Sequence, residues 1–137
     1  MSVTSEELNV MSIATTTGAA HARTARLGIR EIVRRLNAAL GATLVAALAG
    51  SKDRKISYKW AQQDGPTPHQ VAVKRLQFAY AQWLVVSEAE GEHVARLWFI
   101  GANPWLDHDS PIDAIRDDRF KETAAAASAM IDDGFTG

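Results

Sequence analysis

The chain contains no cysteine, which excludes disulfide bonds and thiolate chemistry and is typical of a reducing compartment. It also has no long hydrophobic segment. The longest weakly apolar run, residues 38–50, is shorter than the roughly 20 residues that a membrane-spanning helix needs. The first residues show no basic segment followed by an apolar core, so no signal peptide is expected. These absences predict a cytoplasmic protein without a membrane span.

Sequence signatures of catalysis are also missing. There is no glycine-rich phosphate loop, no H-E-x-x-H pair and no nucleophile with a base at a typical spacing. His69 and His93 have the surroundings of surface residues, and His21 lies in the N-terminal tail. Asp107–Asp109 reads Asp-His-Asp, but adjacent loop residues rarely converge on one ion, so a solvated turn is the better interpretation. We therefore expect a protein that is not an enzyme and needs no cofactor or metal.

Positive and negative charges are segregated, although the net charge is only −1. Residues 23–75 contain eleven Lys/Arg against three Asp/Glu, whereas residues 76–137 contain four Lys/Arg against eleven Asp/Glu. The first region therefore carries +8 and the second −7, and Glu6 and Glu7 account for the rest. This division indicates either two surfaces for different partners or two ordinary solvated faces.

The spacing of apolar residues predicts an all-α fold. Residues 1–22 are polar, Thr-rich and aperiodic, and are interpreted as a flexible N-terminal tail. Helical spacing begins at Ile29 and predicts helices near residues 29–40, 44–48, 54–62, 68–89, 94–98 and 111–115. A last helix is expected to start at Asp117 or Asp118. Glycines predict several helix ends, and Ser110 with Pro111 predicts a helix start.

The chain is predicted to divide after the tail into residues 23–67 and residues 68–137. The first region has the pattern of a helix-turn-helix bundle, and the second has a long connecting helix followed by a small helical domain. In the second region, Trp98 is expected in the core beside Val94 and Leu97. Trp105 and Leu106 are expected to fold back onto the core after the Asn-Pro turn, with Ile112 and Ile115 beneath them.

Residues 43–62 contain two short predicted helices joined by a polar turn, and the second carries several basic side chains. Basic residues at such a place contact phosphates, and neighbouring polar residues can read base edges. A corner of a helical bundle with a solvated basic face is the alternative. The candidate DNA-binding residues are Lys52, Arg54, Lys55, Ser57, Tyr58 and Lys59.

One residue pattern resembles a known family. It reads W-x4-N-P-x-L-x4-P-x3-I and is formed by Trp98, Asn103, Pro104, Leu106, Pro111 and Ile115. This pattern resembles the C-terminal domain of the Xre/MbcA/ParS antitoxins. The similarity continues through residues 116–135 and extends upstream through residues 56–86, so that it covers roughly residues 27–137. From the residues alone, we interpret the six pattern positions as structural.

The resemblance implies a function. Such antitoxins belong to type II toxin-antitoxin systems; they dimerise, bind a RES-domain toxin that consumes NAD+ and occlude its active site with their C-terminal end. Several also repress their own operon by binding operator DNA. The corresponding toxin-binding residues here are Ile131, Asp132, Asp133, Gly134, Phe135, Thr136 and Gly137.

The acidic C-terminal end agrees with that implication, because a pocket for NAD+ pyrophosphate is expected to be electropositive. In the sequence, Gly134 is expected to end the last helix and leave a short free end. Two alternatives stay open: a stand-alone helix-turn-helix DNA-binding transcriptional regulator, and a helical protein with only a structural role.

Overall fold

The computed structural model describes the backbone of residues 5–136 and the side chains of residues 16–132. Over this range every regular element is helical, which confirms the predicted all-α class. The part of the chain described contains no helix long and apolar enough to cross a membrane. In chain order the elements are α1 (Ser5–Arg26), α2 (Ile29–Leu40), α3 (Ala42–Ala49), α4 (Ile56–Ala61), α5 (Gln70–Glu90), α6 (Glu92–Ile100), the 3-10 helix η1 (Pro104–Leu106), α7 (Pro111–Arg116) and α8 (Phe120–Thr136).

Helix α5 is the centre of the fold. Helices α1, α2, α3, α6, α7 and α8 all pack against it, and residues 79–86 are buried without interruption. A helix that is buried all round must have neighbours on every side. The sequence predicted one apolar face on this helix, formed by Val73, Leu76, Tyr80, Trp83 and Leu84. That prediction understates the burial, since both faces of the second half are covered.

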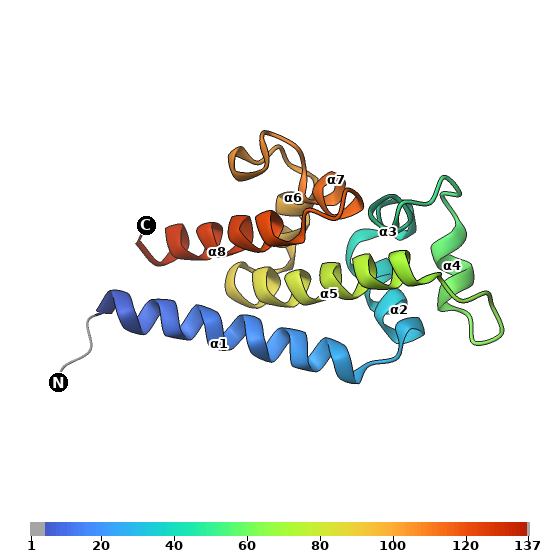
Figure 1. Cartoon of the computed structure of the whole chain (residues 1–137), viewed down its shortest axis with the longest axis horizontal. Coiled ribbons are helices and arrows are strands. Elements are labelled where there is room, and N and C mark those ends of the chain that lie inside the picture. The colour runs from blue at the N-terminus through green and yellow to red at the C-terminus, as the bar shows by residue number, and fades with distance from the viewer. Residues whose placement is uncertain (1–4, 137) are drawn as a thin grey trace.

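The prediction of a flexible tail over residues 1–22 is wrong from Ser5 onwards, because Ser5–Arg26 form helix α1. Figure 1 shows α1 lying alongside α5, and the two helices are in extensive contact. Ala20 and Thr24 are buried, and the Thr24 hydroxyl donates to the carbonyl of Ala20 at 2.8 Å. The described contact face uses small residues, so the sequence carries no strong apolar periodicity there.

Most predicted helix ends are confirmed. Gly41, Gly50 and Gly91 follow α2, α3 and α5 with φ angles of 88°, 89° and 90°, a region that glycine adopts without strain. The Ser110 side chain accepts from the backbone N–H of Asp113 at 3.1 Å and caps α7, with Pro111 in first position.

The ends of the last helix differ from the prediction. Helix α8 begins at Phe120 because Asp118 has a φ of 61° and cannot belong to a helix. Its backbone N–H instead donates to the carbonyl of Ile115 and closes α7. Gly134 does not end α8, which continues to Thr136, so the expected free end from Phe135 is also wrong as far as Thr136.

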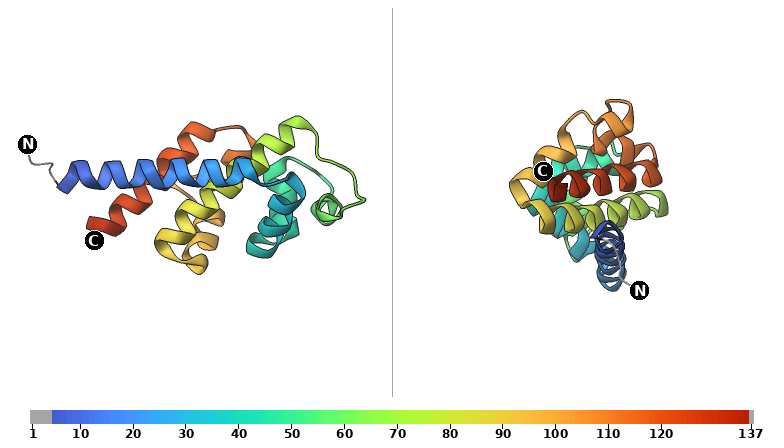
Figure 2. Two further views of the ribbon diagram at one scale, coloured as in Figure 1. Left: turned by 90° about the horizontal axis from the view of Figure 1, so that it is seen from below. Right: turned by 90° about the vertical axis from the view of Figure 1, so that its left-hand side faces the viewer.

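One hydrophobic cluster contains residues from every helix between α1 and α8, so the predicted regions 23–67 and 68–137 share a core. Figures 1 and 2 show the arrangement along the long axis. Helix α4 lies at one end of the molecule, and the last turn of α8 lies at the other, beside the first turn of α1. The basic region around α4 and the acidic C-terminal end are therefore far apart.

Replacing Ala20 with glutamate is expected to destabilise the protein by about 2–3 kcal/mol, because an unpaired carboxylate cannot be buried between α1 and α5. Thermal unfolding measures the loss. Ala22→Glu is the matched control, since Ala22 is exposed on the same helix and gains the same side chain. Equal melting temperatures for the two variants would show that α1 does not pack on α5.

Candidate functional site

Asn103 organises the turn between α6 and α7. Its side-chain oxygen accepts from the backbone N–H of Trp105 at 2.9 Å. Its own carbonyl accepts from the backbone N–H groups of Leu106 and His108, and its N–H donates to the carbonyl of Asp109. One residue therefore satisfies most of the backbone N–H groups of a tight turn, which is the role that Asn favours in such positions.

The other residues of the pattern surround this turn. Leu106 and Ile115 are fully buried, Pro111 is buried, and Trp98 packs edge-on against Phe99 with ring centroids 5.0 Å apart. Pro104 begins η1 and is exposed. Five of the six side chains thus lie in or at the core, and the pattern forms a single corner of the molecule.

Trp105 does not fold back onto the core, because 62% of its surface is exposed. Val94 and Leu97 were also expected in the core, and both are exposed together with Ile100. Helix α6 packs on α5, α7 and α2 through its opposite face, so these side chains stay partly exposed. The prediction failed because an apolar residue on an uncovered surface has the same sequence signal as a core residue.

A groove lies beside Trp105, between η1 and the second half of α8. It has a volume of about 520 Å³. We call it the Trp105 groove, and it is lined by Glu90, Trp98, Asn103, Pro104, Trp105, Ala126, Ala129 and Met130. The Trp98 indole N–H is buried and finds no acceptor in the described part of the chain. Such an unpaired donor costs about 1–3 kcal/mol.

Arg119 ties the turn to the start of α8. Its guanidinium pairs with Asp107 and Asp109 at 3.2 Å each, and its Nε donates to Glu122 at 3.0 Å. Asp107 and His108 have positive φ angles of 56° and 70°, so this backbone needs such support. The hydrogen bond from Arg119 lowers the pKa of Glu122.

Across the described residues, no three His, Asp or Glu side chains gather as a metal site would require.

The candidate DNA-binding residues fall into two groups. Lys52, Arg54, Lys55 and Lys59 are exposed, and Tyr58 is 60% exposed. Their side chains make no ion pair or hydrogen bond within the described range. We call these five the basic segment; it occupies the α3–α4 turn and the outer face of α4.

Ser57 does not belong with them. It is fully buried, and its hydroxyl donates to the carbonyl of Ala42 at 2.9 Å. The expectation that Ser57 reaches base edges is therefore wrong. The hydrogen bond also explains how a serine occupies a core position between α3 and α4, where an apolar residue is usual.

The arginines of α2 are used within the fold. Arg30 donates to the carbonyls of Trp60 at 3.1 Å, of Gly65 at 2.7 Å and of Gln62. Arg35 donates to the Tyr80 hydroxyl at 2.9 Å and pairs with Glu31, which lowers the pKa of Glu31.

Arg34 donates to the carbonyl of Ala61 at 3.1 Å and also pairs with Glu31. A part of the positive charge of residues 23–75 is thus structural, and the basic segment contributes four of its exposed cations.

The predicted toxin-binding end is only partly described. Ile131 is buried in the core at 5% exposure, so it is unavailable to a partner, contrary to expectation. Asp132 is exposed. The backbone of residues 133–136 continues α8, but the side chains of Asp133, Gly134, Phe135 and Thr136 and all of Gly137 lie outside the described residues.

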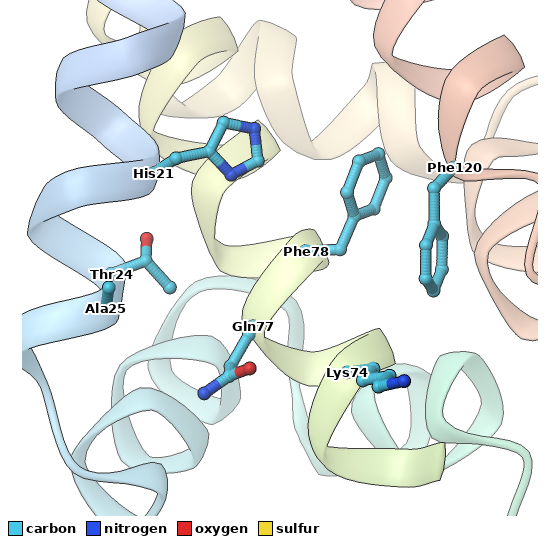
Figure 3. Close-up of a pocket in the computed structure, with 7 residues that line it drawn as sticks. All are labelled: His21, Thr24, Ala25, Lys74, Gln77, Phe78 and Phe120. Carbon is cyan, nitrogen blue, oxygen red and sulfur yellow. The ribbon is translucent and has the colours of Figure 1, made fainter. Parts of the chain in front are cut away.

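A second cavity, of about 410 Å³, lies between α1, α5 and α8 and is shown in Figure 3. Phe78 stacks on Phe120 with ring centroids 4.6 Å apart, and His21 lies 6.3 Å from Phe78 on the other side. Lys74 and Gln77 lie along its lower edge in Figure 3. The sequence could not reveal this cavity because one wall is α1.

No protein-family model matches the chain. Comparisons with curated proteins and with solved structures also find no match.

Replacing Arg119 with glutamine is expected to raise the pKa of Glu122 toward its ordinary value, because the strongest hydrogen bond to the carboxylate is lost. The lowered pKa of Glu122 stabilises the folded state at pH values above the pKa that this group has in the unfolded chain. The stabilisation is lost as the pH falls through the pKa of Glu122 in the folded chain. NMR titration of the Glu122 carboxyl carbon measures the shift.

Arg116→Gln is the control, since Arg116 pairs with Asp113 and not with Glu122. The variant protein should also lose less stability between pH 7 and pH 3 than the native chain does. An unchanged Glu122 titration in Arg119→Gln would contradict the assignment.

Proposed function

We propose that this protein is an antitoxin that binds a RES-domain toxin and occludes its NAD+ site with the end of α8. The observation that supports the proposal is the pattern from Trp98 to Ile115, which resembles that of the Xre/MbcA/ParS antitoxins. Its residues are not scattered, because Asn103 and the buried Leu106 and Ile115 form one corner. That corner orients α8 through Arg119.

The end of α8 has the properties that such an inhibitor needs. Asp132 is exposed near the end of α8, and Asp133 and Phe135 follow in the sequence. A site that binds the pyrophosphate of NAD+ attracts negative charge. An acidic end with one aromatic ring can therefore occupy the place of the dinucleotide. Inhibition in this form requires no catalysis by the antitoxin itself.

Binding of operator DNA is a second function that we propose for the basic segment. Its four cations and Tyr58 are exposed and unpaired within the described residues, which favours contacts with phosphates. In this proposal α3 and α4 act as a helix-turn-helix, and a homodimer presents two of them to two half-sites. Since α4 and the end of α8 lie at opposite ends of the molecule, DNA and toxin do not compete for one surface.

Deleting residues 134–137 is expected to preserve folding and to weaken neutralisation, because Ile131, the last residue with a described buried side chain, remains in place. NAD+ levels in cells that co-express the protein of the adjacent open reading frame, which the proposal takes to be the RES-domain toxin, measure neutralisation. A Lys55→Gln, Lys59→Gln double variant keeps the C-terminal end and should neutralise like the native chain. Full protection of NAD+ by the truncated protein would overturn the inhibitory role of the end.

The same double variant is expected to weaken binding to the protein's own promoter and to reduce the slope of log K against log salt by about 2. Each lost lysine removes about one phosphate contact. Filter binding or fluorescence anisotropy over a range of salt concentrations measures the slope. Lys121→Gln, at an exposed position on α8, should leave the slope unchanged. Promoter binding that does not depend on Lys55 and Lys59 would contradict the assignment.

A further inference from the structure

We propose that the Trp105 groove is a second contact site for the toxin and receives an aliphatic side chain from a toxin segment that carries a neighbouring Lys or Arg. This inference rests on the proposed function, because it names where else the same partner binds. The end of α8 would enter the toxin's pocket, while the groove would hold the toxin's surface.

The exposure of Trp105 is the first argument. Its indole is 62% exposed, next to a hollow of about 520 Å³ rather than on a convex surface. Tryptophans in such positions are enriched among the residues that dominate binding energy in protein interfaces. The backbone at Trp105 is fixed by the corner, because the Asn103 side-chain oxygen accepts from the Trp105 N–H.

The chemistry of the lining defines the occupant. Ala126, Ala129 and Met130 contribute small or adaptable apolar surface from α8, which suits an aliphatic side chain. The Trp98 N–H has no acceptor in the described part of the chain. A main-chain carbonyl of the bound segment would satisfy this donor once the atoms that bury the N–H move aside. In an extended segment the aliphatic side chain and the main-chain carbonyl are attached to adjacent backbone atoms, so one residue can provide both.

The charge of the lining argues for a basic neighbour. Glu90 lines the groove and forms no ion pair with any described residue. It belongs to residues 76–137, whose charge is −7. A Lys or Arg beside the aliphatic side chain would pair with Glu90, whereas an acidic segment would be repelled.

Continuity along α8 links the groove to the inhibitory end. Ala129 and Met130 line the groove, and Ile131 to Thr136 follow on the same helix. With a rise of 1.5 Å per residue, the first residue of the deleted end lies only about 8 Å along the axis from Ala129. A toxin that accommodates the end of α8 must therefore lie against this side of the helix as well.

Isothermal titration calorimetry measures the affinity of the full chain for the purified protein of the adjacent open reading frame, which is the toxin under the proposed function. Trp105→Ala and Ala129→Arg are each expected to weaken binding about 30-fold or more, as for an interface hot spot. Both positions are at least partly exposed and arginine favours helix, so melting temperatures should stay near that of the native chain. Tyr58→Ala is the matched control, because Tyr58 is 60% exposed at the other end of the molecule.

Glu90→Lys tests the proposed ion pair separately from the apolar contacts. Weaker binding of this variant to the toxin supports a basic residue beside Glu90, and stronger binding overturns the proposed ion pair. Native-like affinity in both Trp105→Ala and Ala129→Arg would overturn the groove while leaving the proposed function intact. Failure of the native chain to bind the toxin would overturn both. Trp105→Ala could instead dissociate a homodimer and leave the affinity of the monomer for the toxin unchanged. That result would assign the groove to a second copy of this chain and overturn the inference.

Discussion

The burial of residues 79–86 of helix α5 on every side is the constraint on which the other helices depend. Residues 79–86 have no solvent-facing side, so α5 is stable only when its neighbours cover it. Helices α1, α2, α3, α6, α7 and α8 provide that cover, and each takes its orientation from α5. The corner at Asn103 and the start of α8 are positioned because α6 and α8 both pack on this helix. The candidate functional surfaces lie where the covering helices end or turn away from it.

The sequence predicted the elements whose signals are local. Glycines with positive φ end α2, α3 and α5, and the Ser110–Pro111 pair starts α7, as expected from capping chemistry. Helix α1 was missed because its described buried residues, Ala20 and Thr24, are small and many of its other residues are polar. It packs extensively on α5, and Arg23 forms an ion pair with Glu88. Such long-range contacts leave no periodic pattern in the sequence.

The candidate sites were harder to predict than the fold, for two physical reasons. Apolar periodicity marks a face but not what covers it, so Trp105, Val94 and Leu97 were assigned to a core that they do not enter. Charge composition counts cations but not their partners. Arg30, Arg34 and Arg35 bind groups of the protein itself, and only the structure separates them from the exposed basic segment. Ser57 could not be placed from the sequence for a similar reason, because its hydroxyl finds a hydrogen-bond acceptor inside the core.

Arg30 has a consequence for how this fold can vary. Its guanidinium donates to the main-chain carbonyls of Trp60, Gln62 and Gly65 in the connection between α4 and α5. Every residue type presents the same main-chain carbonyl. Exposed side chains in that connection, such as Gln62 and Gln63, can therefore be exchanged over evolutionary time without loosening the anchor. Arg30 itself cannot be exchanged for lysine at no cost, because one ammonium does not present the same planar fork of donors. Descendants of this chain should thus diverge quickly in the connection and slowly at the arginine that holds it.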